Sequence, residues 1–178
     1  DRHYYYGTHE APEFEVTNDV PVVDATNATV NNATIKRTNP NGIVYLAEGS
    51  TADNGSNVVV GQTCDNLVLT DGHPFTATKN FKATNAKYEM TAIAASTDKS
   101  FGTIMLPFAI NSLPNGAKAY SLENNVVWGE DIHATEVSSI AANTPTIVTA
   151  KGTYAANKVA IAATGSTYEN GQLVGTYK

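Results

Sequence analysis

The chain has 178 residues, of which 16% are charged, and its formal net charge is −6 at pH 7. This length is typical of one domain or two small ones, and it can bury a core without disulfide staples. Because Lys and Arg are scattered almost singly, the charge pattern argues against nucleic-acid binding by phosphate neutralisation.

Neutral residues must supply most of the polar surface. The sequence contains 23 Thr and 18 Asn, and these residue types favour strands and turns respectively. This composition predicts a β-rich secreted or cell-surface protein. No apolar run approaches the roughly 20 residues that span a bilayer, so no membrane insertion is expected. No signal segment opens the chain, and we expect any signal or anchor to lie outside it.

The chain opens with an aromatic segment. Tyr4, Tyr5 and Tyr6 would place rings on both faces of an extended backbone. We expect residues 1–18 to be an arm or edge strand that packs on the main domain, residues 19–178. The alternative is an exposed aromatic platform that contacts a glycan or a partner protein.

Short strands separated by turn signals follow this arm. Pro21 restricts the apolar residues around it to an edge strand or an irregular strand. The run Asn39-Pro40-Asn41-Gly42 is a strong turn signal. The four apolar residues that follow it, at positions 43–46, predict a strand.

A hairpin is predicted next, from strands at residues 58–60 and 64–70 around a turn at Gly61-Gln62. Cys64 lies between polar neighbours, which predicts a cysteine on a half-buried strand. Because it is the single cysteine, neither an intrachain disulfide nor a cysteine-based metal site can form.

The second half of the chain reads in the same way. Residues 86–93 alternate between apolar and polar, which predicts a half-exposed antiparallel strand. Residues 101–108 form the densest apolar run, and we expect a strand there that is buried on both faces. Further strands are expected at residues 117–122, 126–128, 132–137, 146–149, 159–163 and 172–177.

Together these patterns predict an all-β chain with little or no helix. Roughly ten to fourteen short strands at regular spacing are typical of an antiparallel β-sandwich. Two small β subdomains are the alternative, with an internal boundary near residues 71–80.

Few residues suggest chemistry. His73 lies near Asp71, and Glu130-Asp131 follow Trp128, but neither pattern has the spacing of a known catalytic set. An enzyme would need two of a small group to converge in a cleft: Asp71, His73, Glu130, Asp131 and His133. The loop from Asp53 to Asn57 lacks the spacing of a calcium site. We therefore expect no catalytic residues, no cofactor and no bound metal.

Several short motifs, in this order and spacing, resemble a β-rich domain of secreted and surface proteins of Bacteroidetes, often found with leucine-rich repeats or immunoglobulin-like modules. The motifs that carry the resemblance are Asn39-Pro40-Asn41, Ile43-Val44-Tyr45-Leu46, Asn57-Val58-Val59-Val60, Cys64, Leu67-Val68-Leu69-Thr70-Asp71, Pro74-Phe75, Gly102-Thr103-Ile104-Met105-Leu106-Pro107-Phe108, Ala119-Tyr120, Ala142-Asn143-Thr144-Pro145 and Gly175-Thr176-Tyr177. The chain departs from the pattern at Met105, where relatives often carry Cys. The resemblance implies an extracellular or outer-surface location and a non-enzymatic role. Relatives continue past Gly175-Thr176-Tyr177 with another hairpin, so a final hairpin is expected to be missing from this chain.

Three functions therefore remain open. The first is a non-catalytic structural or adhesive domain at the cell surface. The second is a filament subunit that assembles by strand complementation, with residues 1–18 as donor and an open sheet edge as acceptor. The third is a glycan-binding module that uses Trp128 or the ring cluster Tyr4, Tyr5 and Tyr6.

Overall fold

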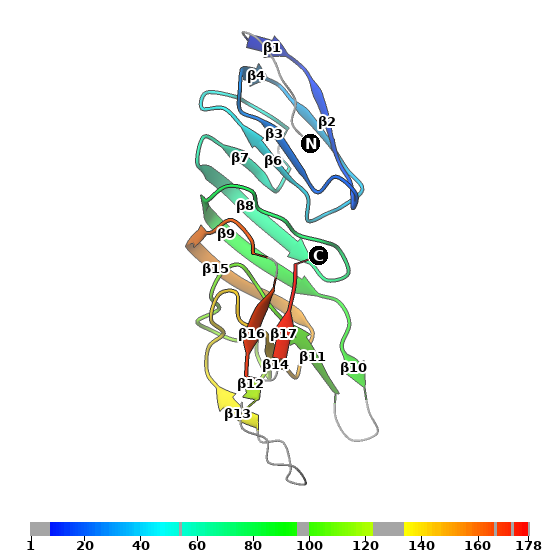
Figure 1. Ribbon diagram of the computed structural model, residues 1–178, viewed down its shortest axis with the longest axis vertical. Helices are drawn as coiled ribbons and strands as arrows, with labels where there is room; N and C mark the ends of the chain where they lie inside the picture. Colours follow the sequence, from blue (N-terminus) through cyan, green and yellow to red (C-terminus); the bar gives the residue numbers. More distant parts are fainter. Residues whose placement is uncertain are drawn as a thin grey trace.

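β-strands make up all the regular structure that is described. The computed structural model describes residues 8–53, 55–95, 100–122, 134–165, 167–171 and 173–177. Within these ranges there is no helix (Figure 1). The prediction of an all-β chain with little or no helix is confirmed for these residues.

The strands, in chain order, are β1 (Thr8–Glu10), β2 (Glu13–Val16), β3 (Val22–Ala25), β4 (Thr29–Asn31), β5 (Thr34–Arg37), β6 (Ile43–Leu46), β7 (Val58–Val60), β8 (Thr63–Thr70), β9 (Phe81–Met90), β10 (Ala94–Ala95), β11 (Ser100–Ile104), β12 (Ala119–Leu122), β13 (Ala134–Val137), β14 (Thr146–Val148), β15 (Gly152–Ile161), β16 (Tyr168–Asn170) and β17 (Leu173–Gly175).

The first strands stack in parallel, each on the strand one coil later. β1 pairs with β4, β2 with β5 and β3 with β6. In all three pairs the partner residues lie 21 positions apart, as in Glu13 with Thr34 and Val22 with Ile43. β6 pairs in parallel with β7, and β8 pairs in parallel with β9. These stacked coils give the first half of the chain the form of a β-solenoid.

The expected antiparallel sandwich is therefore wrong. The largest sheet has the order β15-β9-β8-β7-β6-β3 and is mixed, because its β3–β6, β6–β7 and β8–β9 pairs are parallel. Antiparallel pairing holds in the second sheet, of order β10-β11-β14-β12-β13. Hydrophobic alternation identifies a strand, but it carries no information about the direction of the partner strand.

Several predicted strands are confirmed. The β7–β8 hairpin pairs Val60 with Thr63 across the predicted turn. β9 includes residues 86–90 of the strand predicted at 86–93, with Ala86 and Met90 buried and Lys87 exposed, but it begins earlier, at Phe81, and ends at Met90. It runs parallel to β8 on one side and antiparallel to β15 on the other, so the antiparallel prediction holds for one of its neighbours.

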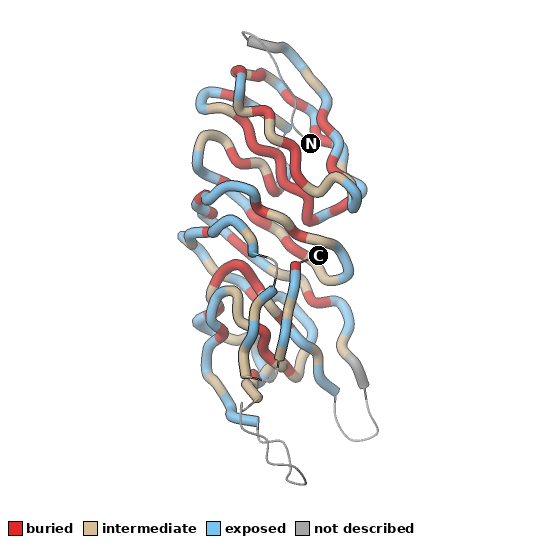
Figure 2. The backbone as a smooth tube through the Cα atoms, in the orientation of Figure 1, coloured by how far each residue is buried: buried red, intermediate tan, exposed pale blue. Residues whose placement is uncertain are grey.

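Two hydrophobic cores share the six-stranded sheet. Val44 and Leu46 on β6 pack inside the solenoid coil with residues such as Phe14. Ile43 and Tyr45 point to the opposite face, into a core shared with the five-stranded sheet. Because β6 is buried on both faces, its sequence is a continuous apolar run rather than an alternating one. The buried backbone follows these strands through the solenoid (Figure 2).

The dense apolar run at residues 101–108 differs from the prediction. β11 ends at Ile104, so only the first part of the run is strand. Phe101 is 46% exposed, whereas Leu106 and Phe108 are buried in an irregular segment that follows β11. The composition of the run identified a core segment, but its order of residues did not reveal which ring faces solvent.

The described part of the aromatic arm, residues 8–18, belongs to the solenoid. β1 and β2 form the first coil, and Phe14 and Val16 are buried in its core. Residues 71–80 connect β8 to its parallel partner β9, and Phe75 and Ala77 from this connection enter the second core.

Stability is expected to depend on the buried Asn57 amide. Its Nδ2 donates to the carbonyls of Pro40 and Val68, both at 3.0 Å, and its Oδ1 accepts from the Val68 N–H at 2.7 Å. Asn57→Ala would leave these buried backbone groups unsatisfied, at a cost of about 3 kcal/mol in free energy of unfolding. Urea unfolding measures this loss.

The matched control is Asn111→Ala, since Asn111 is an exposed asparagine. Its free energy of unfolding should change by no more than about 0.5 kcal/mol. Equal losses in the two variants would show that the buried hydrogen bonds do not hold the coils together.

Candidate functional site

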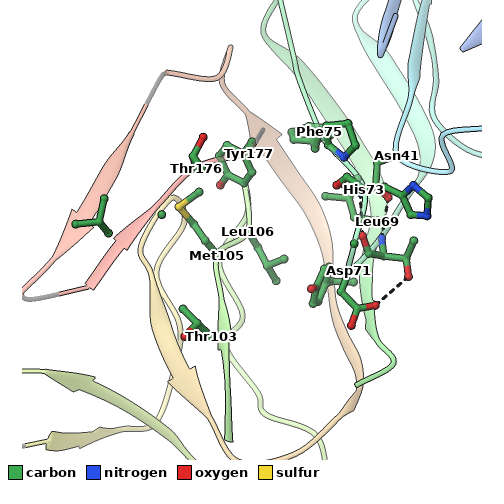
Figure 3. Close-up of a pocket in the computed structure, with 16 residues that line it drawn as sticks. Asn41, Leu69, Asp71, His73, Phe75, Thr103, Met105, Leu106, Thr176 and Tyr177 are labelled. Atoms are coloured by element: carbon green, nitrogen blue, oxygen red, sulfur yellow. Dashed lines mark hydrogen bonds between the residues drawn. The ribbon is translucent and has the colours of Figure 1, made fainter. Parts of the chain in front are cut away.

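A large concave site is a groove between the C-terminal hairpin and the end of β8. Its volume is about 560 Å³. One wall is β17 with the residues that follow it, including Thr176 and Tyr177. The other wall is the segment from Leu69 to Phe75, and Met105 and Leu106 lie between the two (Figure 3).

Tyr177 anchors the first wall. Its ring packs edge-to-face on Phe75 and on Tyr168, with centroid distances of 5.6 and 5.5 Å. Its hydroxyl donates to the Asn143 side-chain oxygen at 2.8 Å, and its carbonyl accepts from the Phe75 N–H at 2.8 Å. Burial raises the pKa of Tyr177, so the phenol stays neutral at physiological pH. The ring and the carbonyl of Tyr177 thus join the hairpin to the β8–β9 connection at Phe75.

A glycine allows β17 to approach the groove closely. A Cβ at Gly175 would lie 2.7 Å from the Met105 sulfur and 3.0 Å from Pro145. Only a residue without a side chain fits this contact without a shift of Met105. The Gly-Thr-Tyr motif is thus a packing motif, in which Gly175 makes room and Tyr177 anchors.

The outer edge of β17 opens onto the groove. β17 pairs with β16 on one side, and no other described strand pairs with it. In an antiparallel pair, alternate residues direct their N–H and C=O groups away from the partner strand. Val174 on this strand is 63% exposed, the most exposed large apolar side chain of those described. The groove therefore combines a strand edge with an apolar lining.

Asp71 and His73 both line the groove, but the structure does not pair them. Asp71 accepts from the Thr91 hydroxyl at 2.7 Å and from the Thr91 N–H at 3.1 Å. Burial opposes ionisation of Asp71, but hydrogen bonds from Thr91 and Ala92 outweigh it and hold its pKa below the ordinary value. The His73 Nδ1 lies 3.3 Å from the Asn18 side-chain oxygen. Asp71 therefore fixes the backbone after β9.

Tyr88 supplies a neutral phenol to the same groove. Burial raises its pKa to about 12, and the nearby Asp71 and Tyr154 add to the shift. A phenol with this pKa stays protonated at neutral pH and can donate a hydrogen bond to a ligand.

The aromatic candidates from the sequence, Tyr4, Tyr5, Tyr6 and Trp128, lie outside the described residues. The same holds for Glu130, Asp131 and His133. Their predicted roles therefore stay predictions.

Asp53, the first residue of the loop from Asp53 to Asn57, accepts hydrogen bonds from backbone N–H groups. It accepts from the Ile35 N–H at 2.9 Å and from the Gly55 N–H at 3.2 Å. Asn57, the last residue of that loop, is buried and hydrogen-bonded to other coils. Across the described ranges, no three His, Cys, Asp or Glu side chains cluster so that they could hold a metal ion.

Sequence reasoning missed the residues that shape the groove. Met105, Val174 and Tyr177 belong to segments that are distant in the chain, and their sequence patterns indicate only strand or core. The available signal was the motif Gly175-Thr176-Tyr177, which marks the end of the resemblance described above.

Comparisons of this chain with protein-family models, with curated proteins and with solved structures found no match. In the described ranges, no helix is long and apolar enough to cross a membrane.

Cys64 is predicted to be unreactive in the folded protein. It lies on β8 between exposed neighbours, as the sequence indicated, and its side chain is fully buried in the second core. Burial raises the pKa of its thiol to about 11, so at pH 8 about one molecule in a thousand carries the reactive thiolate. Modification by a disulfide reagent at pH 8 should be slow until urea unfolds the chain. Fast modification of the native protein would contradict this placement.

Proposed function

We propose that this chain is a non-catalytic structural or adhesive domain that holds a partner protein by accepting one extended segment along β17. The observation that carries the proposal is the strand edge of β17, which opens onto a groove of about 560 Å³. Strand addition uses main-chain hydrogen bonds for affinity and side-chain pockets for specificity. The groove offers both.

The apolar lining supports an occupant with apolar residues at alternate positions. Met105 and Tyr88 are partly buried, and Val174 is largely exposed. A strand beside β17 would cover these side chains with every second residue, since successive side chains point to opposite faces. Burial of this apolar surface would favour the complex and would offset part of the entropy lost on association.

The polar groups of the groove also favour binding over chemistry. Asp71 is occupied by Thr91, and His73 lies beside Asn18. Tyr88 stays neutral up to high pH. These groups can orient a backbone, but they do not form an acid–base pair.

The donor is proposed to be a segment of another chain. The described residues of the aromatic arm already pair with their own β4 and β5, and Phe14 and Val16 are buried there. If the donor belongs to a second copy of this chain, the result is a filament; if it belongs to another protein, the result is an adhesive complex.

An extracellular or outer-surface location, as the resemblance to Bacteroidetes surface proteins implies, is part of the same proposal. It is supported by the low charge content and the abundance of Thr and Asn. Neutral hydroxyl and amide groups keep such a surface hydrated without strong dependence on salt.

The test is selection of ten-residue peptides from a displayed library, followed by measurement of their affinity. Selected peptides should share alternating apolar residues and should protect the β17 backbone from hydrogen exchange. Val174→Lys places a charge on the edge, and it should weaken binding by at least about tenfold. The thermal midpoint of this variant should stay unchanged, since Val174 is 63% exposed.

The matched control is Ala160→Lys, which adds the same charge to an exposed position on β15. This strand lies at the edge of the six-stranded sheet. It should bind the selected peptides as the wild type does. Equal affinity of wild type and Val174→Lys for every selected peptide would overturn the proposal. Light scattering of the free protein distinguishes the filament from the adhesive complex.

A further inference from the structure

Three neighbouring strands of the six-stranded sheet depart from the regular alternation of buried and exposed side chains. In a regular strand a single exposed residue separates two buried ones, but each of these strands has two exposed residues in succession: Asp65-Asn66 on β8, Thr84-Asn85 on β9 and Asn157-Lys158 on β15. In each strand the flanking residues, such as Cys64 and Leu67 on β8, face the second core. The extra residue therefore falls at the same level in all three strands.

The strand register confirms this alignment. Cys64 pairs with Ala83 and Asn66 pairs with Asn85, while the residues between them are skipped. On the other side of β9, Asn85 pairs with Asn157. Lys158 has a positive φ of 51°, a conformation that non-glycine residues seldom adopt. Because the skipped residues match one for one across the three strands, the register is the same on either side of them.

The result is a row of three amides, Asn66, Asn85 and Asn157, across adjacent strands. Asn is disfavoured in strands, and this row does little for the stability of the fold. The Asn85 amide makes one long contact, Nδ2 to the Asp65 carbonyl at 3.4 Å. No side-chain hydrogen bond of Asn66 or Asn157 is found within the described ranges. The buried Asn57 amide, in contrast, makes three.

The row lines a groove of about 450 Å³. Asn111 and Ser112, from the segment after β11, add two further neutral polar side chains. Val68 and Val159 add apolar surface. Lys87 is the one charged residue in the lining, and its ammonium group lies 3.0 Å from a Glu89 carboxylate oxygen. The groove is therefore electrically neutral, polar and partly apolar.

We propose that this amide row is a binding site for a neutral carbohydrate chain. An amide donates and accepts hydrogen bonds at once, as a sugar hydroxyl does. The apolar side chains suit the C–H face of a sugar ring. Adjacent strands lie about 4.8 Å apart, so three amides in register span roughly 10 Å, the reach of a short oligosaccharide.

The geometry favours a carbohydrate over a peptide. The row crosses the strands, and the backbone groups of β8 and β9 are used within the sheet. An extended peptide that lies along the row, across the strands, would therefore find no unpaired backbone on β8 or β9. The neutral lining also gives no electrostatic attraction to phosphate groups. This site is separate from the β17 groove and does not depend on the function proposed for it.

Affinity electrophoresis of the full chain tests the proposal, with dextran, mannan, xylan and a β-glucan as neutral probes and alginate as an acidic one. At least one neutral probe should retard the wild type, and alginate should not. A variant with Asn66→Ala, Asn85→Ala and Asn157→Ala should keep the wild-type thermal midpoint and lose at least about tenfold in affinity.

Two controls make the outcome specific. Thr153→Ala changes an exposed residue of β15 outside the groove lining, and Val174→Lys changes the β17 edge; both should bind carbohydrate as the wild type does. The proposal is overturned if no neutral probe retards the wild type or if alginate retards it equally. Unchanged binding by the triple variant, or competition by the peptides selected for β17, would also overturn it.

Discussion

Buried asparagine amides hold the coils together, and the groove at β17 depends on them. Asn41 donates to the carbonyls of Thr70 and His73, both at 2.9 Å, and accepts from the Thr70 N–H at 2.8 Å. Asn39 donates to the Pro74 carbonyl at 3.0 Å. Where the chain leaves a strand, these amides replace the hydrogen bonds that the sheet no longer supplies. One wall of the groove is thus fixed by residues that lie some thirty positions earlier in the chain.

The six-stranded sheet joins the solenoid to the second half of the chain, because it contributes residues to both hydrophobic cores. Because β6 is buried on both faces, the solenoid core and the second core constrain the same backbone. β8 and β9 extend the sheet beyond the solenoid, where one face carries Leu67 and Ala86 into the second core. The opposite face carries the exposed amide row, beside Asn111 and Ser112 from the segment after β11.

The sequence predicted the strands better than it predicted their arrangement. Thr and Asn abundance and short apolar runs identified an all-β chain, and the run at residues 43–46 marked its most buried strand. The 21-residue coil was missed because its repeat is uneven: β3 and β6 share apolar residues at three paired positions, whereas β2 and β5 share one, Phe14 with Ile35. The groove at β17 was missed because its walls are distant in sequence. Asp71 and His73 are close in sequence and were candidates for an acid–base pair, but Asp71 hydrogen-bonds to Thr91 and His73 lies beside Asn18.

Asparagine has opposite roles at its buried and its exposed positions in this chain. At Asn57 the amide is buried and all its described hydrogen bonds are to backbone groups, so it stabilises the fold. At Asn66, Asn85 and Asn157 the amides are exposed, in register and largely unsaturated. A chain with only 16% charged residues has few other groups with which to recognise a ligand. Its surface can act through backbone edges, hydroxyls and amides, and those are the groups that the β17 groove and the amide row present.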